Sequence, residues 1–157
     1  MMNDPTSTLP LFVYGTLRDP ELMNAVLGRR LPPSSVHPAR APGFRAVLYP
    51  RRAYPALVRA PGGQAAGLLI TGLTPFERDL LDAYEGDEYR RAPIAAVLAD
   101  EPELHEADAY LPATVIPPDA PEWSLSRWQA EHKPRALVAE AAMAAELRAR
   151  LIAVRPH

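Results

Sequence analysis

Ionisable side chains are concentrated in residues 82–91 (DAYEGDEYRR), which contain four carboxylates, two tyrosines and two arginines. Burial raises the pKa of a carboxylic acid, and a raised pKa suits a group that takes up and returns a proton near neutral pH. Most glutamates at such a position are exposed and inert. The segment is therefore a candidate acid–base site, although spacing alone does not show which carboxylate would act.

A glycine turn follows the first apolar run of the chain. Residues 11–14 (LFVY) are apolar and aromatic, and residues 15–18 (GTLR) come directly after them. A glycine at this point lets the backbone turn sharply and leaves successive N–H groups without partners. Such amides can hold an anion or a developing oxyanion. The alternative is an ordinary strand-to-helix turn, in which glycine is common.

Several common mechanisms lack their sequence signatures. The chain has no G-x-S-x-G elbow, no P-loop and no G-x-G-x-x-G turn. It also has no cysteine, which excludes a disulfide, a thiolate metal site and a cysteine nucleophile. We expect the scattered histidines to lie at the surface rather than bind metal, because none is spaced i,i+4 from another. They are His37, His105, His132 and His157. We therefore expect no metal and no cofactor.

The overall composition is that of an ordinary globular domain. The 157 residues are 48% hydrophobic and 23% charged, with a net charge of −2, which gives no reason to expect nucleic acid or an anionic membrane as a partner. The first residues lack the basic and apolar regions of a signal peptide, and no apolar run is long enough to cross a bilayer. We expect one domain in a cytoplasmic protein.

Nineteen prolines are spread along the chain, which favours short elements joined by stiff turns. A helix is expected at residues 20–27, with Asp19 as N-cap and Gly28 as its stop. A second begins at Pro75 after the N-cap Thr74 and breaks near residue 86. Strands are expected at 11–14, 35–41, 44–49, 55–60, 65–72, 89–98 and 106–111.

The last third of the chain is helical in composition, with helices expected at 121–132 and 134–153. An apolar stripe on the second helix is expected to pack on the domain, although a homodimer through these helices remains an alternative. The stripe consists of Leu137, Ala141, Ala144, Leu147 and Leu151. Trp123 and Trp128 are interpreted as core residues rather than ligand contacts. The predicted fold is α+β, with residues 1–9 as a flexible tail, 10–111 as the domain and 112–157 as a helical extension packed on it.

Four segments together resemble the γ-glutamylcyclotransferase-like (AIG2-like) family. They are residues 12–18 (FVYGTLR), 54–58 (YPALV), 67–69 (GLL) and 81–91 (LDAYEGDEYRR), in the family's order and spacing. The match spans residues 11–111, and Thr16-Leu17 places the chain nearest the γ-glutamylamine cyclotransferase branch. The resemblance implies a small mixed β-barrel with surrounding helices and a pocket at one end.

The resemblance also implies roles for individual residues. Glu85 aligns with the family's catalytic glutamate and would be the general acid and base. The amides of Gly15, Thr16 and Leu17 would hold the γ-glutamyl group, while Tyr14 would mainly pack and fix the loop. The pocket walls would include Tyr54, Pro55 and Tyr89, and the C-terminal helices could cover the pocket mouth or contribute side chains to it. The partner would be a small γ-glutamyl compound whose α-amine attacks its own γ-carbonyl to release 5-oxoproline.

Three alternatives remain open at the level of the sequence. The same pocket could belong to a binding module that holds a γ-glutamyl-like acidic metabolite without turnover. An exposed apolar face on residues 137–151 would favour an interaction protein. A different amide or acyl transfer could use the same glutamate, since resemblance of fold does not fix the reaction.

Overall fold

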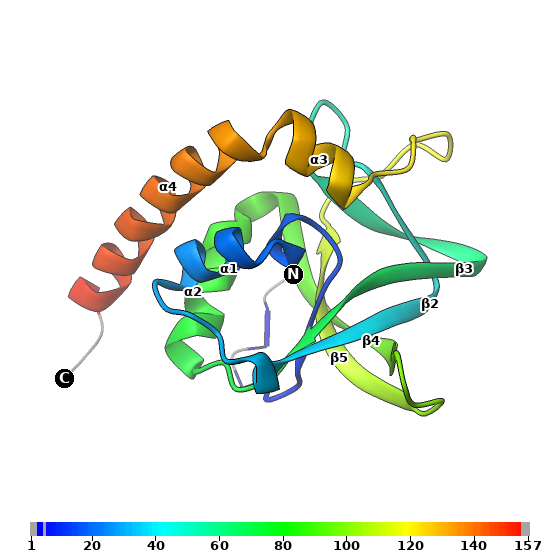
Figure 1. Ribbon diagram of the computed structural model, residues 1–157, viewed down its shortest axis with the longest axis horizontal. Helices are drawn as coiled ribbons and strands as arrows, with labels where there is room; N and C mark the ends of the chain where they lie inside the picture. The colour runs from blue at the N-terminus through cyan, green and yellow to red at the C-terminus, as the bar shows by residue number, and fades with distance from the viewer. Residues whose placement is uncertain (1–2, 5, 155–157) are drawn as a thin grey trace.

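The computed structural model describes residues 3–4 and 6–154, and its strands form a closed barrel of five that lies to one side of the three longest helices (Figure 1). The strands are β1 (Leu11–Val13), β2 (Val36–Leu48), β3 (Pro55–Ile70), β4 (Tyr89–Leu98) and β5 (Leu104–Pro112). Their order around the barrel is β1-β3-β2-β4-β5. β1 pairs parallel with β5, and the other pairs are antiparallel. The predicted α+β fold with a mixed barrel is confirmed.

Two long strands replace four of the predicted short ones. β2 runs through both 35–41 and 44–49, with a register shift between Pro42 and Phe44. β3 likewise joins 55–60 and 65–72. The prediction of four separate strands was wrong because the glycines that interrupt the apolar pattern form β-bulges within a strand and do not end it. Gly43 and Gly62 both have a φ of +79°, the left-handed region that favours glycine.

The first two long helices form where their caps were predicted. In α1 (Pro20–Leu27) the Asp19 carboxylate accepts a hydrogen bond from the Leu22 amide at 3.0 Å. In α2 (Pro75–Glu85) Thr74 and Glu77 form a capping box. Three short 3-10 turns complete this part of the chain: η1 (Thr16–Arg18), η2 (Pro33–Ser35) and η3 (Gly86–Glu88). α2 therefore ends directly in a turn at the acidic segment.

The C-terminal helices are α3 (Leu125–Glu131) and α4 (Lys133–Val154), and α4 lies along α1 and α2 (Figure 1). Ala144 is fully buried, and Leu137 packs against the same core, so the predicted stripe does face the domain. α3 begins four residues later than predicted, at 125. The reason is that residues 121–123 pair with β2, where the Leu48 amide donates to the Pro121 carbonyl and the Trp123 amide to that of Ala46.

Alternation along β1 separates two hydrophobic cores. Phe12 and Tyr14 point into the barrel, whereas Leu11 and Val13 belong to the core between the barrel and the helices. The second of these cores includes Trp128, as predicted. Gly67 allows β3 to approach β1, because a Cβ there would lie 2.6 Å from the Phe12 ring.

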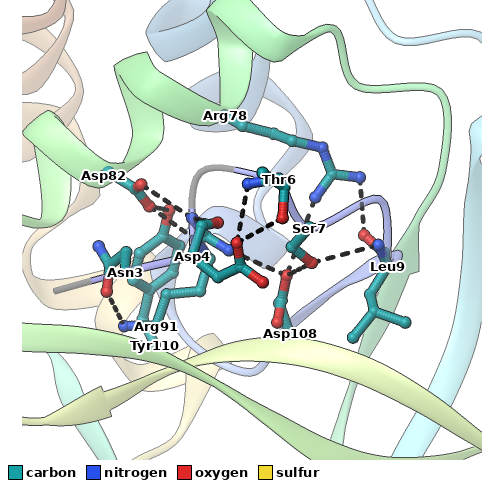
Figure 2. A network of polar contacts seen from close by, with 10 residues as sticks. All are labelled: Asn3, Asp4, Thr6, Ser7, Leu9, Arg78, Asp82, Arg91, Asp108 and Tyr110. Carbon is teal, nitrogen blue, oxygen red and sulfur yellow. Dashed lines mark hydrogen bonds and ion pairs between the residues drawn. The ribbon is translucent and has the colours of Figure 1, made fainter.

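Residues of the predicted N-terminal tail contact the barrel. The Arg91 amide donates to the Asn3 side chain at 2.7 Å, and the Ser7 hydroxyl donates to Asp108 at 2.5 Å (Figure 2). Residues 1, 2 and 5 of this segment lie outside the described residues. None of the helices in the described part of the chain is both long and apolar enough to span a membrane.

Candidate active site

One cavity of about 730 Å³ lies between the barrel and the helices. Its walls come from the β1–α1 turn, the β2–β3 loop, the end of α2 and the two C-terminal helices. All eight residues singled out from the sequence line it: Tyr14, Gly15, Thr16, Leu17, Tyr54, Pro55, Glu85 and Tyr89. The structure thus gathers four segments far apart in the chain around one volume.

The β1–α1 turn presents the start of a short helix to the cavity. Within η1, the Arg18 amide donates to the Gly15 carbonyl and the Asp19 amide to the Thr16 carbonyl, both at 3.0 Å. The amides of Thr16 and Leu17 precede those of Arg18 and Asp19 in the chain. The first amides of a helical turn have no hydrogen-bond acceptor within that turn. The turn also contacts the opposite wall, since a Cβ on Gly15 would lie 2.8 Å from Pro55 Cγ. Amide donors therefore lie at the cavity wall, as an oxyanion site requires.

Glu85 is the last residue of α2 and is half-buried at the cavity. Gly86, with a φ of +63°, then turns the chain away into η3. Burial raises the pKa of the Glu85 carboxyl, and the nearby carboxylates of Glu140, Glu88 and Asp82 raise it further, to about 8. Near neutral pH this carboxyl can therefore exchange a proton in either direction.

Tyrosine hydroxyls around Glu85 are used for internal hydrogen bonds. Tyr14 donates to the carbonyl of Tyr110, and Tyr89 donates to that of Pro55 at 2.6 Å. Tyr54 donates to the Glu88 carboxylate, and burial with this contact raises the pKa of Tyr54 to about 12. These phenols stay protonated at neutral pH. The role expected for Tyr14, packing that fixes the loop, agrees with its buried position.

Asp82 lies one helical turn before Glu85 and joins a polar network behind the cavity (Figure 2). The Arg91 guanidinium donates to Asp82 at 3.0 Å and to Asp108 at 3.1 Å. The Tyr110 hydroxyl donates to Asp82 at 2.6 Å, while Tyr110 itself lines the cavity. The network therefore ties the end of α2 to β4 and β5.

The C-terminal helices do contribute side chains to the cavity, but sequence reasoning did not indicate which ones. These are Trp128, His132, Arg135, Ala136, Ala139, Glu140 and Met143. Trp128 is both a core residue and part of the cavity wall, and His132 is exposed, as expected, but lies beside the cavity. A signal was available, because residues 136, 139, 140 and 143 share one helical face and Glu140 interrupts its apolar character.

A possible donor set for a metal ion lies elsewhere, at the β4–β5 turn. Ligand atoms of Glu101, Glu103 and His105 lie within 4.8 Å of one another, and none of these residues lines the cavity. Both glutamates are exposed, and exposed acidic groups of this kind are common without an ion. We assign this group no role.

Comparisons with known proteins show the same fold and family. AIG2-like protein A of Arabidopsis thaliana is 33% identical over 124 residues, which cover 78% of this chain and 73% of that protein. A solution structure of another A. thaliana protein is 31% identical and superposes with a TM-score of 0.64 over 85% of this chain and 89% of that one. A structure named gamma-glutamyl cyclotransferase shares the fold, with a TM-score of 0.57 and 14% identity over 95% and 89% of the two chains.

The family described as "Gamma-glutamyl cyclotransferase, AIG2-like" matches residues 11–130, which include the barrel, the β1–α1 turn, Glu85 and all of α3 except its last residue. This match covers more than half of the chain and supports a cyclotransferase-type role. The chain belongs to the gamma-glutamyl cyclotransferase, AIG2-like family.

Proposed function

We propose that the protein releases 5-oxoproline from a γ-glutamyl amine or γ-glutamyl peptide, with Glu85 as the general acid and base. The observation that carries the proposal is the position of Glu85, whose pKa is raised to about 8 in the same cavity as the β1–α1 turn. A proton acceptor and a set of amide donors on one cavity are the two elements that an intramolecular acyl transfer needs.

The reaction asks for little beyond positioning, because the nucleophile and the electrophile belong to one molecule. The Glu85 carboxylate takes a proton from the substrate's α-ammonium group, and the freed amine attacks the γ-carbonyl carbon. The carbonyl oxygen becomes an oxyanion, which the amides of Gly15, Thr16 and Leu17 stabilise. Tyr54, Pro55 and Tyr89 form the walls that keep the substrate folded back on itself.

Collapse of the tetrahedral intermediate breaks the bond to the leaving nitrogen. Over the whole reaction two protons leave the α-nitrogen and two are added to the leaving amine. A carboxyl that alternates between its acid and base forms can carry out both transfers. A pKa near 8 suits both halves of this cycle, because neither form is strongly disfavoured near neutral pH. A glutamate at its ordinary pKa would be a weaker base.

The proposal is tested by product analysis. Purified protein is incubated with glutathione, γ-glutamyl dipeptides and γ-glutamyl-ε-lysine, and free 5-oxoproline is quantified by mass spectrometry. Glu85→Gln is expected to lower the rate at least ~100-fold, the usual range for loss of a general acid–base group. Glu146→Gln is the matched control, since this side chain is 74% exposed on α4 and does not line the cavity.

Thr16 and Leu17 suggest the γ-glutamylamine cyclotransferase branch. Among the γ-glutamyl compounds tested, we therefore expect γ-glutamyl-ε-lysine to be turned over fastest. Release that survives Glu85→Gln would reject the assignment of the base but keep the reaction. No release from any compound, with ligand binding still seen as a thermal shift, would favour the binding module over the enzyme.

A further inference from the structure

Helix α4 completes the wall of the cavity beyond the point at which the family match ends. The match stops at residue 130, whereas Ala136, Ala139, Glu140 and Met143 all line the cavity from α4. Three of these four side chains are apolar. Glu140 is therefore a charged group among apolar side chains of α4, and Arg135 is the other charged residue that lines the cavity from this helix.

Glu140 is held at the cavity by its surroundings. It is half-buried, and burial raises the pKa of its carboxyl, while the neighbouring Tyr84 side chain lowers it. Among the described residues, no Lys, Arg or His forms an ion pair with it within 4 Å. Arg135 also lines the cavity but is exposed. A partly desolvated carboxylate without a cation is costly unless a ligand supplies the positive charge.

The second carboxylate at the cavity is Glu85 itself. Glu85 and Glu140 both line the cavity, and the charge of Glu140 is, after burial, the largest cause of the raised pKa of Glu85. Two acids beside one partly closed volume create a site for a cation. The substrate class proposed above brings one cationic group in every member, the α-ammonium of its γ-glutamyl part. An ammonium has three N–H donors, so it can contact both carboxylates at once.

We propose that Glu140 is a substrate-binding residue whose carboxylate receives the α-ammonium group of a γ-glutamyl compound, beside Glu85. This inference rests on the proposed function for the identity of the ligand. With one N–H bonded to Glu140, the nitrogen is fixed while Glu85 removes a proton, and the freed lone pair is aimed at the γ-carbon. Glu140 itself remains a carboxylate and exchanges no proton with the substrate.

The test measures selectivity for the ammonium group by binding. Two probes are used, γ-glutamylethylamide and N-ethylglutaramate, which is the same molecule without its α-amino group. Kd values are measured by calorimetry in a Glu85→Gln background, which blocks turnover. Adding Glu140→Gln is expected to weaken binding of γ-glutamylethylamide at least ~10-fold and that of N-ethylglutaramate less than ~2-fold. Adding Glu146→Gln instead is expected to change neither.

Equal losses for both probes, or no loss for either, would overturn the inference, since a purely structural role would not distinguish them. Binding of neither probe in the Glu85→Gln background would overturn it as well. Should Glu140→Gln fail to fold, Glu140→Ala replaces it, with the same loss of at least ~10-fold confined to the ammonium probe. Product release by the wild type decides the proposed function separately. Selective binding without release would reject the reaction and keep Glu140 as the ammonium contact.

Discussion

Arg91 holds Asp82 at 3.0 Å, one helical turn before Glu85. The same guanidinium lies 3.1 Å from Asp108, and the Arg91 side chain is only 5% exposed. A residue of β4 thus joins the end of α2 to β5 (Figure 2). Because Glu85 ends this helix, the buried ion pairs also fix the direction from which its carboxyl enters the cavity.

Replacement of Arg91 by alanine is expected to lower the free energy of unfolding by about 3 kcal/mol, because it leaves the Asp82 carboxylate without its cation and the buried Asp108 with only its longer contact to Arg78 at 3.9 Å. Urea denaturation followed by circular dichroism measures the change. Arg127→Ala is the control, since its pair with Glu131 is exposed at both ends and should contribute at most ~1 kcal/mol. Similar losses in both variants would contradict the role given to Arg91.

Local signals in the sequence predicted much of this arrangement. The caps at Asp19 and Thr74 and the stop at Gly86 placed the two helices that flank the cavity. Four predicted strands proved to be two, because a glycine bulge and the end of a strand interrupt an apolar sequence pattern in the same way. The helical pattern marks Glu140 as a charge among apolar residues, but which element this face meets depends on how α4 packs against α2, a tertiary relationship that no local pattern contains.

Glu85→Gln is expected to stabilise the protein at alkaline pH while it lowers activity. The pKa of Glu85 rises from 4.5 to about 8 on folding, so between these values the folded state binds more protons than the unfolded state. Wild-type stability therefore falls relative to the variant as pH rises from 5 to 9. The relative gain for Glu85→Gln is roughly 2–4 kcal/mol, less than the full shift implies because the cavity is open to solvent.

Thermal unfolding of both proteins at pH 5, 7 and 9 checks this expectation. The difference in Tm between Glu85→Gln and the wild type should increase with pH, whereas Glu146→Gln, altered at an exposed site, should differ from the wild type by a constant amount. A difference for Glu85→Gln that is independent of pH would mean that the carboxyl titrates near its ordinary pKa.

The acid limb of the pH–rate profile should report the same group. Only the carboxylate form of Glu85 accepts a proton, so kcat/KM is expected to rise with pH in a titration curve whose midpoint lies near pH 8. Release of 5-oxoproline from γ-glutamylethylamide between pH 5.5 and 9 measures it. Other ionisable groups that line the cavity are Tyr14, Tyr54, Tyr84, Asp87, Glu88, Tyr89, Tyr110, His132, Arg135 and Glu140.

The Glu140→Gln variant tests whether Glu85 produces the acid limb. Removing the negative charge of Glu140 should lower the pKa of Glu85 and move the limb to lower pH. Tyr54 is not expected to produce this limb, since its pKa is raised to about 12. A wild-type limb centred near pH 4.5, or one that Glu140→Gln leaves in place, would disagree with the electrostatics of the cavity.

Gly15→Ala is expected to damage the site more than the fold. The new Cβ would lie 2.8 Å from Pro55 Cγ, a ring atom that cannot rotate away, so the β1–α1 turn or the β2–β3 loop must shift. We expect kcat/KM to fall at least ~10-fold, because the amide donors of the turn lose their position relative to Glu85. Steady-state kinetics with γ-glutamylethylamide measures the loss.

Two further variants distinguish a clash from general destabilisation. Gly15→Ala combined with Pro55→Ala removes the opposing ring and should recover part of the lost kcat/KM. Gly43→Ala places a side chain at a φ of +79° in the β2 bulge, where a Cβ meets nothing within 4 Å. It should cost about 1 kcal/mol of stability and leave KM unchanged, since only backbone strain is introduced, at a residue that does not line the cavity. If Gly43→Ala impaired turnover as much as Gly15→Ala, the loss would follow from stability and not from the position of the turn.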